Sequence, residues 1–258
     1  MKPLQDRRIL VTRRSEQAGP LVDGLRALGA TVVEVPLIAR EPPEDAAPLD
    51  RALDRLTSYE WLAFTSANAV QAVADRLAQL GIPLPAGVRL ASVGPTTARA
   101  IAERFRGRRV ELQPASGYRA EGLVEAFRAH GLAGRRVLLP VSDRARDTLA
   151  AGLRAQGADV DRVVAYRTVM PDGARDLLER ALADGIDLAV LASPSAVEAL
   201  TLALGGRAGA LSVAVIGPVT EQAAREAGLD VRVVGSPSTV DGLLAALPRA
   251  FPPGATPP

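Results

Sequence analysis

Short apolar runs alternate with longer amphipathic stretches along the whole chain. The runs are rich in Val, Ile and Leu, and they predict strands near residues 9–12, 31–37, 61–66, 88–93, 110–113, 137–141, 160–166, 188–192, 212–216 and 231–234. The stretches between them predict helices that include residues 67–80, 96–105, 119–130, 148–156, 196–204 and 219–227. Several helices are expected to end at a glycine, namely Gly29, Gly81, Gly131, Gly157 and Gly228. Nearly continuous apolar strands that alternate with helices predict an α/β fold with parallel sheets covered on both faces.

The chain also repeats itself, with an offset of about 120–128 residues. Four short matches occur in the same order in both halves: RRIL at 7–10 and RRVL at 135–138, TSANAV at 65–70 and ASPSAV at 192–197, VGPTT at 93–97 and IGPVT at 216–220, EGL at 121–123 and DGL at 241–243. Four ordered matches indicate two halves that share one five-strand plan.

The domain boundaries are not expected at the joint between these halves, because residues 130–134 have no linker character. Two other segments do, near residues 36–41 and 164–170, and both resemble extended chain that ends in proline. Cutting there predicts a discontinuous first domain, residues 1–37 and 169–258, and a second domain, residues 42–165. Each holds a doubly wound parallel sheet of five strands. Residues after about 249 are expected to form a frayed tail.

Composition excludes much of the usual chemistry of active sites. The chain has no Cys, one His and a net charge of +2, so zinc sites, thiol nucleophiles and His-based triads have little or no support. The charge balance also argues against a nucleic-acid partner. No apolar run is long enough to cross a membrane, and the polar first residues do not resemble a signal peptide, so we expect a cytoplasmic protein.

The loops that follow the strands carry the candidate chemistry. In doubly wound sheets, ligands bind beyond the carboxyl ends of the strands, against helix N-termini. Here those loops are small, hydroxylated or rich in Gly and Pro, and Arg13, Arg14 and Arg144 follow the first strands of the two halves. The hydroxyls are either helix caps or part of an anion-binding cleft, and the arginines either bind carboxylates or are solvated. Tyr166 lies in the second linker, where it is either an ordinary edge-strand residue or a functional one.

Together, these stretches resemble the uroporphyrinogen-III synthase family over residues ~8–248. The resemblance rests on VTRR at 11–14, FTSANAV at 64–70, VGPTTA at 93–98, VAYRT at 164–168, ASPSAV at 192–197, IGPVT at 216–220 and SPST at 236–239. It implies two flavodoxin-like domains joined by a two-stranded linker, the first domain being discontinuous. It also implies an enzyme that closes hydroxymethylbilane into uroporphyrinogen III, with inversion of the last pyrrole ring and loss of water, without metal or organic cofactor.

The resemblance also suggests roles for individual residues. Tyr166 matches the family's linker tyrosine, whose protonated phenol can assist departure of hydroxide. Thr97 and Thr220 correspond to cleft threonines, and some members carry Arg near Asn68, so we expect Arg13 or Arg144 to compensate there. The expected binding residues for the polycarboxylate substrate are Thr12, Arg13, Arg14, Ser66, Asn68, Thr96, Thr97, Ser142, Arg144, Ser193, Ser195, Gly217, Pro218 and Thr220.

Two other functions remain open. A non-catalytic two-domain ligand-binding protein of the periplasmic-binding type would share the two domains and the crossing segments. A nucleotide-using transferase has less support, because the chain lacks phosphate-loop glycines. For an enzyme of the resembled family, we expect a monomer that receives its substrate by transient handover from hydroxymethylbilane synthase.

Overall fold

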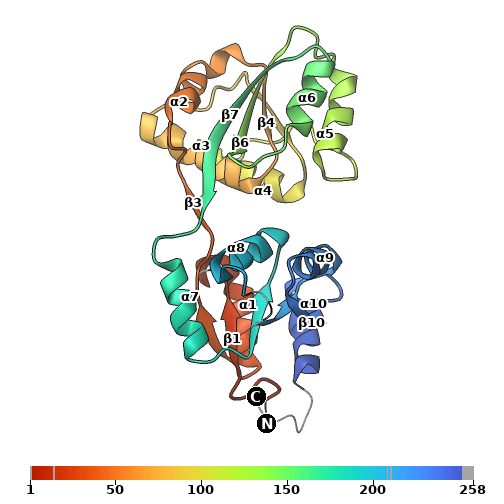
Figure 1. Ribbon diagram of the computed structural model, residues 1–258. Helices are drawn as coiled ribbons and strands as arrows, with labels where there is room; N and C mark the ends of the chain where they lie inside the picture. Colours follow the sequence, from red (N-terminus) through yellow and green to blue (C-terminus); the bar gives the residue numbers. More distant parts are fainter. Residues whose placement is uncertain (1, 14, 208, 210, 252–258) are drawn as a thin grey trace. The chain divides into compact units, whose positions relative to one another are not determined.

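The computed structural model describes residues 2–13, 15–207, 209 and 211–251 (Figure 1). The chain forms two compact units, which we call unit 1 (Met1–Ala39 and Val169–Pro258) and unit 2 (Arg40–Thr168). The chain therefore leaves unit 1 after Ala39 and re-enters it at Val169. The predicted tail beyond residue 249 falls mainly on residues 252–258, which lie outside the described residues, while Leu247–Ala250 form a 3₁₀ turn.

Unit 1 contains a five-stranded parallel sheet. Its strands are β1 (Arg8–Val11), β2 (Thr31–Glu34), β8 (Leu188–Leu191), β9 (Ser212–Val215) and β10 (Asp230–Val234). They lie in the order β10-β9-β8-β1-β2, and all the pairs are parallel. The order reverses between β1 and β8, which is the topological switch point where doubly wound sheets place their ligands.

Helices cover both faces of this sheet. They are α1 (Ser15–Ala27), α7 (Ala174–Ala183), α8 (Pro194–Leu204), α9 (Pro218–Glu226) and α10 (Val240–Ala246). Ile9 and Val11 of β1 pack in a core with α1 and α10, whereas Leu10 between them packs in a second core with α7, α8 and α9. The alternation of β1 side chains between two cores is the reason its sequence is apolar without interruption.

Unit 2 is built on the same plan. Its sheet has the order β3-β7-β6-β4-β5, with strands β3 (Ala39–Glu41), β4 (Trp61–Phe64), β5 (Arg89–Ser92), β6 (Arg136–Ser142) and β7 (Asp159–Val169). The pairs β7–β6, β6–β4 and β4–β5 are parallel. The switch point of this sheet lies between β6 and β4, because β5 follows β4 on one side and β7 follows β6 on the other.

The helices of unit 2 form two layers. Helices α2 (Ala47–Asp54), α3 (Ala67–Leu80) and α4 (Pro95–Arg104) share one core with Leu62 and Phe64. Helices α5 (Ala120–Phe127) and α6 (Thr148–Ala155) share the other core with Trp61 and Ala63. Trp61, the only tryptophan, is fully buried, and its ring meets that of Phe127 edge-on at 5.1 Å.

The predicted fold class is confirmed, and three details of the strands differ from the prediction. The strand expected at 110–113 is wrong: Leu112 makes only an isolated bridge to Ala91. The strand expected over 31–37 ends at Glu34, although the N–H groups of Val35 and Leu37 still donate to the carbonyls of Val11 and Thr12. Strand β3 was not predicted, since Ala39–Glu41 lacks an apolar pattern and becomes a strand only by pairing with β7.

The repeated EGL and DGL triplets have a common structural cause. Gly122 and Gly242 are each the third residue of their helices, α5 and α10. A Cβ on Gly122 would overlap the carbonyl oxygen of Gly117, and a Cβ on Gly242 would overlap that of Pro237. In both units the preceding loop therefore crosses the first turn of the helix at a distance that only glycine permits.

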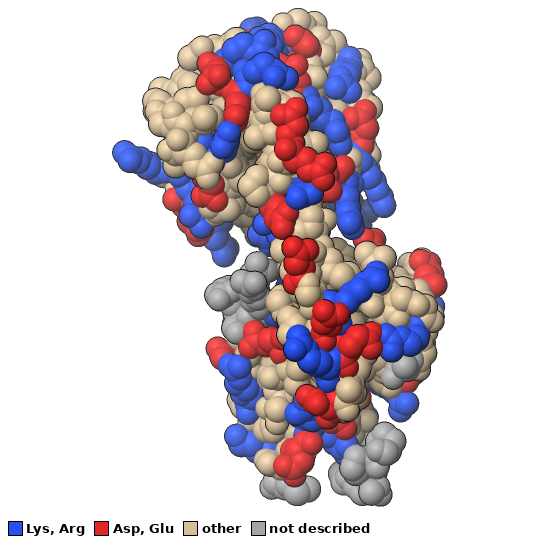
Figure 2. All heavy atoms as spheres, turned by 60° about the vertical axis from the view of Figure 1, so that its left-hand side comes forward, with Lys and Arg blue, Asp and Glu red and all other residues tan. Residues whose placement is uncertain are grey.

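The surface carries mixed charge. Acidic and basic side chains are interspersed on the face of the molecule that Figure 2 shows. Within the described part of the chain, no helix is both long enough and apolar enough to cross a membrane.

Candidate functional site

The carboxyl ends of the strands form one edge of each sheet, which we call its carboxyl edge. In unit 2, the β4–α3 turn at this edge is capped by Ser66, whose Oγ accepts a hydrogen bond from the Ala69 N–H at 3.1 Å. The phenolic oxygen of Tyr166 on β7 lies 3.4 Å from the same Oγ. Two residues that are 100 positions apart thus present neighbouring hydroxyls beside the switch point.

The loop after β6 completes this group. Ser142, the last residue of β6, is the strand partner of Tyr166, and the Asp143 N–H donates to the Tyr166 carbonyl at 3.1 Å. One oxygen of the Asp143 carboxylate accepts the Thr168 N–H at 3.2 Å. The β6–α6 loop is therefore fastened to the end of β7 next to Tyr166. Arg144 follows it and is exposed, with no hydrogen bond or ion pair in the described structure.

The β5–α4 turn brings further hydroxyls to the same edge. Thr97 is buried in the first turn of α4, whereas Thr96 beside it is exposed. The side chain of Tyr118 lies against Gly94, where a Cβ would come within 3.0 Å of it. Tyr118 is 52% exposed, so an aromatic ring borders this turn. Asn68, in the first turn of α3, is half-buried.

At the carboxyl edge of unit 1, Arg13 and Ser193 meet across 180 positions of sequence. Ser193 caps α8: its Oγ accepts the Ala196 N–H at 3.3 Å. The same oxygen accepts a hydrogen bond from Nη2 of Arg13 at 3.3 Å and lies 3.0 Å from the Oγ of Ser195. Arg13 is thus held at the switch point between β1 and β8, with two hydroxyls beside it.

A cavity of about 320 Å³ opens at this switch point. Its wall is mainly apolar and includes Val11, Ala18, Leu21, Val190, Ile216 and Val240, while Thr12 and Arg13 are the polar residues among the described lining. Helix α1 contains Pro20 and has a non-helical Ala18 two residues earlier. Proline interrupts helical hydrogen bonding at such a point, and the resulting kink accounts for the space between α1 and the strands.

The second Gly-Pro turn, after β9, resembles its counterpart in unit 2. Thr220 is buried like Thr97, and a Cβ on Gly217 would overlap the side chain of Ser238. Pro218 is exposed, and Val219 is 70% exposed, which is unusual for an aliphatic side chain. The turn therefore offers its backbone and an apolar surface at the carboxyl edge, while Thr220 is buried beside it.

Most of the predicted site residues lie at the two carboxyl edges. Within unit 2, the structure brings Ser66 and Ser142 to Tyr166; within unit 1, it brings Ser193 and Ser195 to Arg13. Arg14 lies outside the described residues. The apolar cavity wall could not be predicted, because its residues look like ordinary core positions in the sequence. Asp143 was not among the predicted binding residues, although it lies in one of the loops that directly follow a strand.

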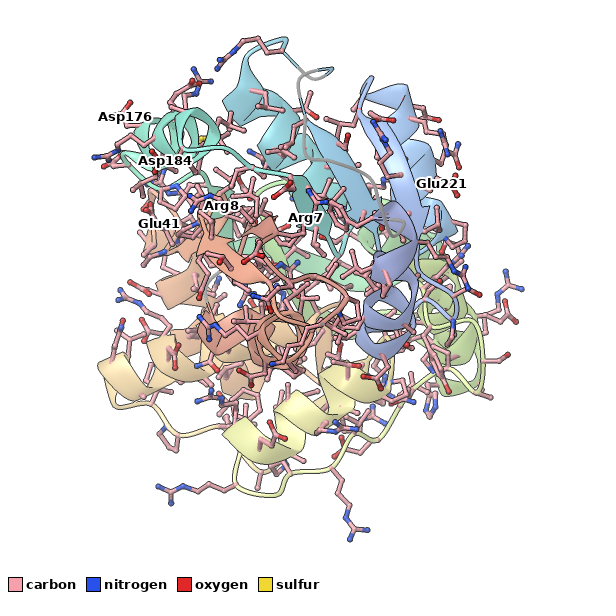
Figure 3. The ribbon with its side chains drawn as sticks, turned by 90° about the horizontal axis from the view of Figure 1, so that it is seen from below. Arg7, Arg8, Glu41, Asp176, Asp184 and Glu221 are labelled. Atoms are coloured by element: carbon pink, nitrogen blue, oxygen red, sulfur yellow. The ribbon has the colours of Figure 1, made fainter. Side chains whose placement is uncertain are left out.

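Charged pairs gather at the opposite, amino ends of the strands. Arg7 pairs with Asp187 at 3.0 Å, and Arg8 donates to the Gly185 carbonyl at 2.7 Å and lies toward Asp184 (Figure 3). In unit 2, burial and a hydrogen bond to Asp161 raise the pKa of Tyr59 to about 12. Tyr59 precedes β4, so this shifted group lies at the amino end of the sheet, away from the carboxyl edge.

The two edges suit anionic ligands. They present hydroxyls, helix N-termini and arginines, and among the described residues no three His, Asp or Glu side chains are grouped to hold a metal ion. Tyr166 is the side chain there best suited to deliver a proton.

Comparison with known proteins places this arrangement in a family. A family model for uroporphyrinogen-III synthase HemD matches residues 19–245. The chain belongs to the uroporphyrinogen-III synthase family. A uroporphyrinogen-III synthase of Synechococcus elongatus is 37% identical over 179 residues, which cover 68% of this chain and 66% of that relative. A putative uroporphyrinogen-III synthase of Methanothermobacter thermautotrophicus is 30% identical over 228 residues, which cover 84% and 88%.

Solved structures of family members share the fold. A mutant uroporphyrinogen III synthase of Thermus thermophilus matches with a TM-score of 0.62 at 18% identity, over 95% of this chain and 98% of that one. The Helicobacter pylori protein matches with a TM-score of 0.56 at 16% identity, over 93% and 97%. The family resemblance seen in the sequence is therefore confirmed, and so is the two-domain α/β fold.

Proposed function

We propose that this protein is a uroporphyrinogen-III synthase, a lyase that closes hydroxymethylbilane into uroporphyrinogen III and releases water. The observation that carries the proposal is the pair of hydroxyls of Tyr166 and Ser66, 3.4 Å apart at the carboxyl edge of unit 2 in a member of this family. Membership supports the reaction, and the pair supplies a proton donor where the fold places ligands.

The residues suit each step of that reaction. The terminal C–O bond of the substrate breaks, and the departing hydroxide takes a proton from Tyr166 to leave as water. The azafulvene electrophile that remains is attacked by the substituted carbon of the last ring, which gives a spiro intermediate. This intermediate fragments and recloses with the ring inverted. The proton that the ring carbon loses when the pyrrole regains its aromaticity returns to the Tyr166 phenolate, so the net change is the release of one water.

Binding geometry is the larger part of the task, because unaided closure of the substrate readily gives the other isomer. Eight carboxylates on the substrate provide many points of attachment, and the carboxyl edges offer hydroxyls, backbone N–H groups and arginines to them. We assign substrate binding to Thr12, Arg13, Ser66, Asn68, Thr96, Ser142, Arg144, Ser193, Ser195, Gly217 and Pro218. Thr97 and Thr220, which are as buried as Thr12, belong to the same proposed set and also shape their turns from within.

Two further proposals follow from this activity. Because the free substrate cyclises without the enzyme, a transient handover from hydroxymethylbilane synthase would limit the loss to the wrong isomer. Because hydroxymethylbilane synthase would supply the substrate, we also propose that this protein lies in the cytoplasm with that enzyme.

The test is the identity of the product. Hydroxymethylbilane is generated from porphobilinogen by its deaminase in the presence of this protein, and the oxidised uroporphyrin isomers are separated. A synthase gives mainly isomer III. A ligand-binding protein without catalysis would bind the tetrapyrrole reversibly and leave isomer I as the product.

A further inference from the structure

The cavity of unit 1 has the properties of a binding site for one small group. Its volume of about 320 Å³ is near the lower end of the range of small-molecule sites, about 300–1,000 Å³. Protein interiors leave few voids of this size, and an apolar wall gives water few partners. The wall therefore favours an organic occupant with an apolar body, smaller than a whole tetrapyrrole.

The polar end of the cavity defines the rest of that occupant. Arg13 lines the cavity, and a guanidinium can bind a carboxylate with two parallel hydrogen bonds, so a carboxylate suits this end of the cavity. Thr12, only 2% exposed, lines the cavity next to Arg13. An apolar ring with a short carboxylate arm can place its ring against the apolar wall and its carboxylate at Arg13.

The hydrogen bonds of Ser193 fix this polar end. Its Oγ accepts the Ala196 N–H and Nη2 of Arg13, which occupies both of its lone pairs. Its own proton is then directed to the Oγ of Ser195. The proton of Ser195, which is exposed, is then directed away from Ser193. Ser193 thus sets Arg13 and Ser195 side by side as donors.

We propose that this cavity binds one carboxylate-bearing pyrrole ring, with the ring against the apolar wall and the carboxylate on Arg13, and that Ser193 is the positioning residue for Arg13. The pyrrole identity of the ring rests on the proposed function, whereas the pairing of an apolar ring with an anion rests on the cavity alone. One ring of the tetrapyrrole is accordingly held by unit 1.

The experiment measures binding of porphobilinogen, a monopyrrole with one acetate and one propionate arm, to the full chain by calorimetry. Methyl resonances of Leu21 and Val240 report whether the ligand enters the cavity. Propionate and unsubstituted pyrrole are the comparison ligands, and each is expected to bind at least about 10-fold more weakly than porphobilinogen. Equal binding of propionate, or unmoved cavity methyls, would overturn the proposal.

Three variants test the cavity and its polar end. Arg13→Gln is expected to weaken porphobilinogen binding about 10- to 100-fold, as removal of a charge-assisted hydrogen bond does. Arg180→Gln, on α7 at the other face of the sheet, is the matched control and keeps full affinity. Ala192→Leu fills the cavity from its wall, so it abolishes binding while the melting temperature holds or rises. A lower melting temperature of Ala192→Leu with unchanged affinity for porphobilinogen would contradict the assignment of the cavity as the binding site.

Ser193→Asp tests positioning against mere capping. Asp caps a helix as well as Ser does, so a purely structural role predicts no loss of affinity. Our proposal predicts a loss at least as large as that of Arg13→Gln, because the new carboxylate takes the guanidinium for itself. Ser193→Thr, which keeps the hydroxyl, is expected to retain affinity within a few-fold. Full affinity in Ser193→Asp would refute the positioning role.

Failure of this proposal and failure of the proposed function are distinguishable. If the wild type makes isomer III but porphobilinogen does not enter the cavity, the pyrrole site is wrong and the synthase stands. If porphobilinogen binds in an Arg13-dependent manner and no isomer III forms, the pyrrole site stands and the synthase is wrong.

Discussion

Gly122→Ala is the substitution whose sign depends most directly on the structure. In an ordinary helix, replacing glycine by alanine stabilises a protein by about 0.5–1 kcal/mol. Here the added Cβ would overlap the backbone oxygen of Gly117 in the crossing loop. A backbone atom cannot swing aside as a side chain does, and such overpacking costs about 1–3 kcal/mol. The difference leaves unit 2 destabilised by about 1–2 kcal/mol.

Trp61 makes the destabilisation of unit 2 measurable by fluorescence. It is the only tryptophan, it is buried in unit 2, and its ring contacts Phe127 at the end of α5. Its fluorescence during urea unfolding therefore reports on the helix that carries Gly122. If the free energy of unfolding falls by about 2 kcal/mol for each molar of urea, the urea concentration at the midpoint of unfolding is expected to fall by about 0.5–1 M.

Two further glycines complete the test. Gly242→Ala, at the equivalent position of α10, is expected to destabilise unit 1 by a similar amount, which circular dichroism measures. Gly87→Ala is the control in unit 2, because its Cβ would enter open space, and its midpoint is expected to stay unchanged. A midpoint for Gly122→Ala at or above that of the wild type would refute the close crossing of loop and helix.

Three other substitutions probe the site and the ionisable pairs. Tyr166→Phe is expected to lower turnover about 100-fold with the fold intact, and nearly full activity would rule out its role as proton donor. Tyr59→Phe removes a phenol whose pKa is raised to about 12 by burial and by Asp161. The neutral phenol therefore stabilises the wild type, and we expect this stabilisation to be lost as the pH rises from about 10 to about 12, but not in the variant. A parallel decline of stability in both proteins would count against the raised pKa. The Arg76 guanidinium donates hydrogen bonds to both carboxylate oxygens of Asp50 at 2.6 Å, which lowers the pKa of that carboxyl. We therefore expect Asp50→Asn to be less stable than the wild type at pH 7 and equally stable once the pH falls well below about 4. A difference in stability that persists in acid would contradict the ion pair.

The fold was largely readable from the sequence because it rests on local patterns. Apolar runs marked the central strands, and every predicted helix-ending glycine has a positive φ, for example 69° at Gly81 and 85° at Gly157. The errors lie where pairing between distant segments decides whether a segment becomes a strand. Leu112 has the composition of a strand but pairs only at one bridge, and Ala39–Glu41 becomes a strand only through β7.

The site was readable only in part. Topology alone placed Tyr166 and Ser66 at one edge, since the carboxyl ends of parallel strands meet there. The hydrogen bond between Arg13 and Ser193 joins residues 180 positions apart, and no local pattern announces it. The cavity beside them depends on the kink at Ala18, which follows from Pro20 but whose effect on packing appears only in three dimensions.

The central claim is that this chain directs ring closure to isomer III, and a coupled isomer assay tests it most directly. Porphobilinogen and its deaminase supply hydroxymethylbilane, and the products are oxidised and separated by chromatography, with and without this protein. Tyr166→Phe and a reaction without the protein are run in parallel. We predict predominantly isomer III with the wild type and isomer I without it. Only isomer I, formed at the spontaneous rate by folded wild-type protein, would contradict the account.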